Sequence, residues 1–402
     1  MQYLKYDNLE KQYFELLLKF CLKVDKTLFI SSDVILKDAT ERFVEYTKNN
    51  GVKEVYVCWS DAVKEAELLK TIEFEDIKTN KAFDNSVWDE YALKNSAFIL
   101  FRSEIPGVFD GVEERKVVEA SRVKRESCKI YKQRQLSYQI SWNIAVLPNE
   151  IWAKTLFKED NFYDKFYYSI FDMCMVSEEG DTLARWKKQL QKNTQLALKL
   201  NKLQIKELHY TAPNGTDLKV KLTPNAIWLG ADKGGIVVNM PTYEVFTFPG
   251  ANGVNGVVKS TRPLYYNGVK IDNFFLEFKN GKVINYKAEQ GAEALGFLLK
   301  IDQGSSRLGE VALVNCNSPV ANQNKVFCNT LLDENASCHF ALGNAYPTTC
   351  KNYQSISKNA NQNGFNLSIV HEDFMVGYNQ LKITALTDQG EVVIMENGII
   401  VL

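Results

Sequence analysis

The sequence predicts an α/β amino-terminal domain followed by a β-rich carboxy-terminal domain, on three observations. Its 402 residues exceed one ordinary core, strand and helix patterns alternate in the first part, and short strands with Asn-Gly turns dominate the second. Strands separated by helical segments of a dozen or more residues are typical of parallel βαβ units. We therefore predict an open, mostly parallel, Rossmann-like sheet within residues 1–185 and a β-rich domain over residues 186–402.

The first domain begins with apolar residues at helical spacing, which are Leu9, Phe14, Leu17, Leu18 and Cys21. Strands are expected at TLFISSDV, EVYVCWS, SAFILFRSEIPG and YQISWNIAVLP. Helices are expected at ATERFVEYTKNNGV, at DAVKEAELLKTI, over residues 115–135, and at NEIWAKTLF. No GxGxxG follows the first strand and no GxxxxGK[ST] occurs, so this sheet is not expected to bind nucleotide phosphates.

The second domain opens with EEGDTLARWKKQLQKNTQLALKLNKLQ, which predicts a charged amphipathic helix at the boundary. Asn-Gly pairs at 214–215, 280–281 and 397–398 then predict tight turns between antiparallel strands. One inserted helix is expected over residues 333–346, ended by Pro347. The loop GANGVNG (250–256) is expected to be a flexible turn facing the active site, because it lacks the residues that follow a phosphate-binding loop.

Charge and composition argue against several kinds of partner. The net charge is -1, and the basic run 123–134 contains Glu126 and is interpreted as one solvated helix face, so no nucleic-acid partner is expected. No stretch reaches 18 apolar residues, so no membrane span is expected. The first 24 residues lack the pattern of a signal peptide, and the eight cysteines form no CxxC pair. We therefore expect a cytoplasmic protein with reduced, mostly buried cysteines.

Histidine, carboxylate and phenol side chains gather in two short stretches. LLDENASCHFALGNAYP carries Glu334, His339 and Tyr346, and in a helix the last two, seven residues apart, would share a face. SIVHEDFMVG carries His371 and Asp373, which face the same way on a strand. Such groups on neighbouring elements can form a divalent-metal site. Taken alone, His339 is better explained as a buried histidine hydrogen-bonded to a carboxylate, because buried polar groups must find partners.

Two further carboxylates lie in apolar, strand-like runs. Glu244 stands in NMPTYEVFTFP and Glu310 in RLGEVALV, where an isolated charge would be costly, although either could point to solvent from a strand edge. Together with the two histidines, Asp373 and Tyr346, they are too many ligands for one tetrahedral ion and suit two bridged ions. Imidazole and oxygen donors without thiolate favour zinc, cobalt or manganese.

The order of PTYEVFT, LGEVALV, DENASCHFALGNAYP and HEDFMVG resembles the thermophilic metalloprotease family of aminopeptidases, the aminopeptidase T and aminopeptidase S group. STRPLYYNG and FKNGKV extend the resemblance through most of the chain. It implies a homodimeric, metal-dependent enzyme that removes residues from peptides with a free N-terminus, using two divalent ions per subunit in a β-rich metal-binding domain. The implied metal ligands are Glu244, Glu310, His339, Tyr346, His371 and Asp373.

The chain departs from the family's pattern at two places. The first motif commonly has two acidic residues, whereas Tyr243 precedes Glu244 here, and the glycine-rich loop replaces a polar, basic stretch after Pro249. The general base is left open between Glu310 and Glu334, with Tyr346 as a candidate donor to the oxyanion. Alternatives are a non-catalytic or regulatory relative, and a two-metal hydrolase of another amide or ester.

Overall fold

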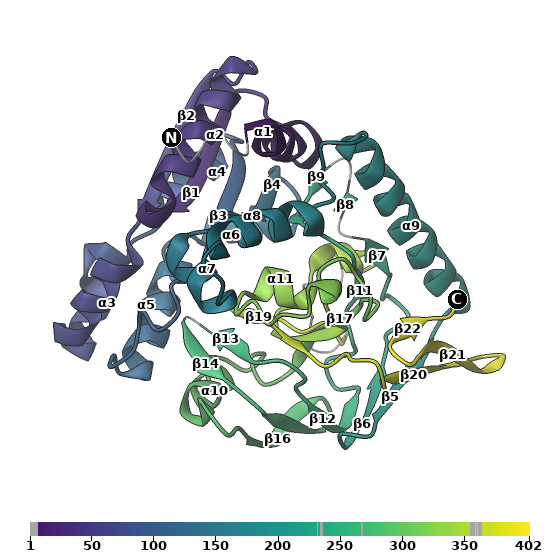
Figure 1. Ribbon diagram of the computed structural model, residues 1–402. Helices are drawn as coiled ribbons and strands as arrows, with labels where there is room; N and C mark the ends of the chain where they lie inside the picture. The colour runs from purple at the N-terminus through teal and green to yellow at the C-terminus, as the bar shows by residue number, and fades with distance from the viewer. Residues whose placement is uncertain are drawn as a thin grey trace. The chain divides into compact units, whose positions relative to one another are not determined.

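The computed structural model describes residues 7–230, 232–233, 236–266, 268–353, 358, 360 and 364–402 (Figure 1). The chain divides into two compact units, the first formed by Met1–Leu190 with Ala231–Thr242 and the second by Gln191–Gly230 with Tyr243–Leu402. The division falls inside helix α9 (Thr182–Leu203). The expected domains, 1–185 and 186–402, stay a prediction about independently folding parts.

The first unit is built on a five-stranded parallel sheet in the order β10-β4-β3-β1-β2. Its strands are β1 (Thr27–Asp33), β2 (Glu54–Ser60), β3 (Ala97–Arg102), β4 (Trp142–Val146) and β10 (Asn239–Met240). Leu28, Phe29 and Ile30 in β1 are fully buried. Such a continuous apolar run is typical of a strand that is covered on both faces. The predicted Rossmann-like, mostly parallel architecture is confirmed, with β10 as a strand returning from later in the chain.

One helix precedes the first strand of this sheet, and the others lie in the connections between its strands. They are α1 (Asp7–Glu15), α2 (Lys37–Asn49), α3 (Ala62–Thr71), α4 (Ser86–Leu93), α5 (Glu114–Glu126), α6 (Lys129–Leu136), α7 (Glu150–Leu156) and α8 (Phe162–Met173). Asp61 and Asn149 cap α3 and α7, because their side chains accept from backbone N–H groups in the first turn. Across the described part of the chain, no helix combines the length and the apolarity needed to cross a lipid bilayer.

The prediction of a single helix over residues 115–135 is wrong. Two helices occupy this region, and Ser127 and Cys128 form a turn between α5 and α6. The Ser127 hydroxyl donates to Lys124 O (2.9 Å) and accepts from Asn85 N (2.8 Å). A serine side chain that bonds to nearby backbone groups competes with helical hydrogen bonding, which favours a helix end at this point.

The larger sheet of the second unit has eight antiparallel strands in the order β16-β15-β12-β6-β5-β20-β21-β22. These are β5 (Glu207–Ala212), β6 (Thr216–Lys221), β12 (Val254–Lys259), β15 (Phe275–Lys279), β16 (Lys282–Lys287), β20 (Lys382–Thr387), β21 (Gly390–Glu396) and β22 (Ile399–Ile400). Asn-Gly turns join three of the pairs as predicted, since β5-β6, β15-β16 and β21-β22 are antiparallel neighbours across residues 214–215, 280–281 and 397–398.

The glycine-rich loop 250–256 is packed, contrary to the flexible turn predicted for it. Gly256 has φ +115, and a Cβ there would lie 2.2 Å from Asp217 O. Gly250 N donates to Lys221 O (2.8 Å), and the Arg307 guanidinium donates to Ala251 O (2.7 Å). The glycines therefore allow the chain to approach the backbone of β6 closely.

The second sheet of this unit has five strands in the order β19-β18-β17-β11-β7. They are β7 (Leu229–Gly230), β11 (Val245–Thr247), β17 (Leu308–Leu313), β18 (His339–Gly343) and β19 (His371–Met375), with helices α10 (Ala292–Leu298) and α11 (Thr330–Glu334) inserted between strands. Phe340 on one face packs on Tyr210 of β5 (ring centroids 4.9 Å) and on Phe374 (5.9 Å). These aromatic contacts join the two sheets and leave the opposite face of the smaller sheet for polar groups.

The inserted helix is much shorter than the predicted 333–346. It ends at Glu334, and residues 339–343 form β18, which pairs with β17 on one edge and with β19 on the other. Alternation explains the difference: Phe340 and Leu342 point to one side, and His339, Ala341 and Gly343 to the other. Pairing on both edges outweighs the helix propensity of the alanine and leucine.

Candidate metal centre

Cross-strand pairing places four of the predicted ligands on one face of the five-stranded sheet. Glu310 in β17 pairs with Ala341 in β18, which in turn pairs with Asp373 in β19. His339 lies two residues from Ala341, and His371 two residues from Asp373, and side chains two apart on a strand share a face. The sheet therefore gathers groups that are 63 residues apart in the sequence, from Glu310 to Asp373.

Glu244 reaches the same face from the start of β11. It lies two residues before Phe246, which pairs with Ala312 beside His339. The residues between the candidate ligands are small, since Ala312 and Ala341 each end at a methyl group. These small side chains leave space above the sheet, so longer carboxylate and imidazole side chains can converge there.

The nitrogen and oxygen atoms meet at separations that suit a shared cation. His339 Nε2 lies 3.1 Å from Glu244 Oε2 and 3.7 Å from Glu310 Oε1. His371 Nε2 lies 3.5 Å from Glu310 Oε2 and 3.6 Å from Asp373 Oδ1. Two ligands that each lie about 2.1 Å from an ion in tetrahedral geometry are about 3.4 Å apart. The side chains thus form two groups, Glu244–Glu310–His339 and Glu310–His371–Asp373, that share Glu310.

Backbone carbonyls fix the orientation of both imidazoles. His339 Nδ1 lies 3.1 Å from Glu334 O and 3.0 Å from Ser337 O, and His371 Nδ1 lies 2.7 Å from Asn344 O. Because a carbonyl oxygen only accepts, each Nδ1 carries a proton and donates it. Each Nε2 is then directed at the carboxylates and is the nitrogen that would bind a cation, the arrangement by which proteins prepare histidines for metals.

Gly309 is required by the packing of this support. An added Cβ would lie 2.3 Å from Gly343 O and 2.4 Å from Asn344 O, the carbonyl that receives the His371 Nδ1 proton. Pairing between β17 and β18 is also irregular at this residue. The glycine before Glu310 therefore lets the His371 support approach β17.

Glu334 belongs to the same cluster, at the end of α11. Its carboxylate forms a third group with His339 and Asp373, in which one donor atom of each lies within 4.8 Å of the others. Glu244, Glu310 and Glu334 are at most 6% exposed. Asp373 Oδ1 is buried with no hydrogen-bond partner in the described structure. Buried carboxylates gathered in this way fit a divalent cation, because charge without compensation is costly in the interior.

The electrostatics of the cluster favour retained protons in the absence of cations. Burial raises the pKa of the Glu310 carboxyl to about 7. Burial, with the neighbouring charges of Asp373 and Glu244, raises the pKa of Glu334 well above its usual range. For His339, burial acts to lower the pKa, but hydrogen bonds to Glu244 and Glu310 raise it well above 6.5. Cations would displace these protons.

Without ions, the protein should lose stability as the pH rises from about 5 to about 8. Folding raises the pKa of Glu310 from 4.5 to about 7, so its stabilising contribution is complete below pH 4.5 and is lost as the pH rises through about 7. His339 acts in the same direction. Bound zinc should stabilise more as the pH rises, because its ligands must be deprotonated. Thermal unfolding with chelator and with saturating zinc should therefore give opposite pH slopes, and parallel curves would contradict this account.

Tyr346 and Tyr243 lie close to the predicted ligands. The Tyr346 ring stands edge-on to His371 (4.7 Å between centroids) and to Phe246 (5.8 Å), so the residue is near the centre although the helical reason given for it was wrong. Tyr243 N donates to Asn335 Oδ1 (2.7 Å). The residue in place of the family's first acidic position thus helps to hold the segment that carries Glu244.

A family model described as thermophilic metalloprotease (M29) matches residues 6–399. The chain belongs to this family. Among its curated relatives, aminopeptidase 2 of Geobacillus stearothermophilus is 34% identical over 397 residues, covering 94% of each chain. Aminopeptidase AmpS of Bacillus subtilis is 33% identical and covers 94% of this chain and 95% of its own. The expected metalloprotease family is therefore confirmed.

Solved structures agree with this membership of the thermophilic metalloprotease family. Wild-type AmpT from Thermus thermophilus superimposes with a TM-score of 0.85 at 26% identity and covers 99% of this chain and 100% of its own. A 2,5-dihydroxypyridine dioxygenase from Pseudomonas putida, with a TM-score of 0.52 and 13% identity, shares the fold alone. The predicted fold class and the assignment to metal-dependent peptide-bond hydrolases are thus confirmed.

Proposed function

We propose that the chain is an aminopeptidase that cleaves the first peptide bond of substrates with a free N-terminus, using two divalent ions. The observation that carries the proposal is the pair of ligand groups that share Glu310. One Glu310 oxygen faces His339 and the other faces His371. Three carboxylates and two imidazoles, with the Tyr346 phenol, are also too many ligands for one tetrahedral ion, which supports two ions rather than one.

The proposed ligands are Glu244, Glu310, His339, Tyr346, His371 and Asp373, and their imidazole and oxygen donors favour zinc, cobalt or manganese. The part of the centre around His371 and Asp373 is more open to solvent than the part around His339. The His371 and Asp373 side chains are 18% and 13% exposed, whereas that of His339 is 1% exposed. A peptide therefore approaches from the side of His371 and Tyr346.

Bound in these groups, the ions would polarise the scissile carbonyl and lower the pKa of a water towards neutrality. Each oxygen of the Glu310 carboxylate faces one of the two ligand groups, so neither oxygen would be available to accept a proton from the water. Glu334 is then the carboxylate that takes the proton from the attacking water and delivers it to the leaving amine. The Tyr346 phenol, beside His371, would ligate as a neutral phenol, so its O–H remains to donate a hydrogen bond to the carbonyl oxygen as negative charge develops there.

Three further expectations belong to this proposal. The enzyme should act as a homodimer, as the family resemblance implies, and it should act in the cytoplasm. Residues 1–185 and 186–402 should fold as separate domains, and every proposed ligand lies in the second.

Metal counting with an activity assay tests the proposal. The purified protein should bind two divalent ions per subunit, and chelation should abolish cleavage of a Leu-linked chromogenic amide. Adding back zinc, cobalt or manganese should restore it. Two bound ions without peptide cleavage under all three metals would instead favour a non-catalytic relative. Turnover of a phosphomonoester in place of the amide would favour another two-metal hydrolase.

A further inference from the structure

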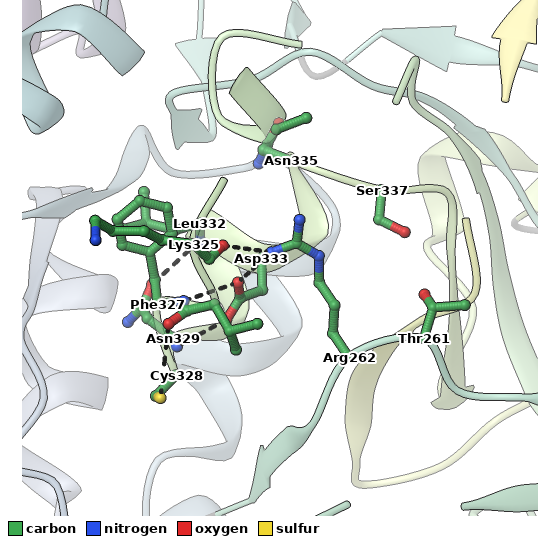
Figure 2. A network of polar contacts seen from close by, with 12 residues as sticks. Thr261, Arg262, Lys325, Phe327, Cys328, Asn329, Leu332, Asp333, Asn335 and Ser337 are labelled. Atoms are coloured by element: carbon green, nitrogen blue, oxygen red, sulfur yellow. Dashed lines mark hydrogen bonds and ion pairs between the residues drawn. The ribbon is translucent and has the colours of Figure 1, made fainter. Parts of the chain in front are cut away.

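A buried ion pair joins Arg262 to Asp333, which lies on the short helix α11 next to Glu334. The Asp333 side chain is 1% exposed and accepts from the Arg262 guanidinium (3.1 Å), from Phe327 N (3.0 Å) and from Asn329 N (3.2 Å). Figure 2 shows these contacts converging on its two oxygens. Asp333 therefore acts within this network and not as a metal ligand, although it is adjacent to Glu334.

Arg262 connects two segments that are distant in the sequence. It lies after β12, its side chain is 17% exposed, and its Nη1 donates to Lys325 O (2.7 Å) as well as to Asp333. A planar guanidinium shared between a carboxylate and a carbonyl restricts both partners more than a flexible ammonium would. The segment from Lys325 to Asp333 is thereby tied to Arg262, in the connection that follows β12 (Figure 2).

Three members of the proposed active centre depend on this anchored segment. Glu334 is the next residue of α11, and its carbonyl faces His339 Nδ1 at 3.1 Å. Asn335 Nδ2 donates to Leu331 O (2.9 Å), and its Oδ1 accepts from Tyr243 N (2.7 Å), the residue before Glu244. The short helix α11 thus helps to fix the orientation of His339, of Glu334 and of the segment that carries Glu244.

The other ligand group has a separate support. His371 Nδ1 donates to Asn344 O, and Asn344 Oδ1 accepts from Ser368 N (3.1 Å). The Ser368 hydroxyl in turn donates to Asp302 (2.9 Å). None of these hydrogen bonds involves α11 or Arg262, so the His371 imidazole is oriented by a different part of the described structure from the His339 imidazole.

We propose that Arg262 and Asp333 are positioning residues for the Glu244–Glu310–His339 ion and for Glu334, and not for the ion held by His371 and Asp373. This rests on the proposed two-ion function. The pair acts through α11 and does not touch substrate or ions. Its loss should weaken one ion selectively, because altered support for a metal-ligating histidine weakens binding about 10–100-fold.

The test uses R262M/D333N, which leaves no unpaired buried charge, and the conservative variant R262K. Stepwise zinc binding to the chelated full-length protein is followed by calorimetry, and the cobalt-substituted protein by its visible spectrum. In R262M/D333N, one of the two dissociation constants should rise about 10–100-fold while the other stays unchanged. The cobalt spectrum should change for the weakened ion only. R262K should be intermediate.

The matched control is R42M/E10Q in the first unit. Arg42 and Glu10 also form a largely buried pair, with Arg42 Nη2 2.6 Å from Glu10 Oε1 and side chains 27% and 7% exposed. This variant should lower the melting temperature and leave both dissociation constants unchanged, which separates positioning from general stability.

Equal weakening of both ions in R262M/D333N and R262K, or two unchanged constants in folded variants, would overturn the positioning role alone. A wild-type protein that binds fewer than two ions would instead overturn the two-ion function and this inference with it. Measuring the wild type first therefore distinguishes the two failures.

Discussion

Changing Glu310 to Gln is expected to lower kcat/KM for an aminoacyl amide by at least about 10³-fold, because bound ions contribute several kcal/mol to transition-state stabilisation and each 1.36 kcal/mol is a factor of ten. Glutamine keeps the shape of the side chain but removes its charge and one of its two acceptor oxygens. Since Glu310 Oε1 faces His339 and Oε2 faces His371, both ion groups lose a ligand at once. Zinc content should therefore fall for both ions.

Steady-state cleavage of a Leu-linked chromogenic amide and metal analysis of the same samples measure this effect. Glu277→Gln is the matched control, because Glu277 is a β15 carboxylate that accepts from Asn285 Nδ2 (3.2 Å), and it should keep full activity and two ions. His339→Ala should also inactivate, with loss of one ion. Full activity in either Glu310→Gln or His339→Ala would refute the proposed ligand set.

The parallel sheet of the first unit could be predicted because its signals are local. Each strand is a short apolar run, and each connection is long enough for a helix whose apolar stripe is visible in the sequence. The His371–Asp373 pair was equally accessible, since a spacing of two on a strand fixes a common face without knowledge of the partner strands. In both cases the spacing of residues along one segment is sufficient to predict which side chains share a face.

The segment around His339 shows where local reasoning fails. HFALG contains good helix formers and stands just after a true helix, so a helical period was assigned to it. Its strand state depends on pairing of β18 with β17 and β19, which come from residues 308–313 and 371–375. Stabilisation from partners so far along the chain cannot be read from a local window. The structure brings His339 into the carboxylate cluster, but from a strand and not from the predicted helix.

The supporting groups could not be predicted for a different reason. The Nδ1 partners of both histidines are main-chain carbonyls, of Glu334, Ser337 and Asn344, and every residue has such a group. Arg262 lies 71 residues before Asp333, and nothing in the sequence pairs them. One feature of this support can be seen in the sequence, which is the start of α11. Asn329 is a typical helix-capping residue, and its side chain accepts from Leu332 N in the first turn.

The Glu334→Gln variant tests which of two carboxylates, Glu310 or Glu334, is the general base, a choice that the sequence alone does not make. It should lower kcat by about 10²–10⁴-fold, the usual contribution of a positioned acid or base. The affinity of both ions and KM should change little, because Glu334 is proposed to move protons and not to bridge. Glutamine cannot accept a proton at neutral pH, yet it fills the same space beside His339 and Asp373.

The decisive measurements for Glu334→Gln are kcat as a function of pH and the number of ions bound in the same samples. In the wild type, a general base must be deprotonated, so kcat should rise with pH through its pKa and then level off. The variant should lose that acidic limb while retaining two ions. Loss of an ion would make Glu334 a ligand, and unchanged kcat would move the base elsewhere. Because Glu310→Gln should empty the centre and Glu334→Gln should leave it loaded but slow, the two variants together assign one role to each carboxylate.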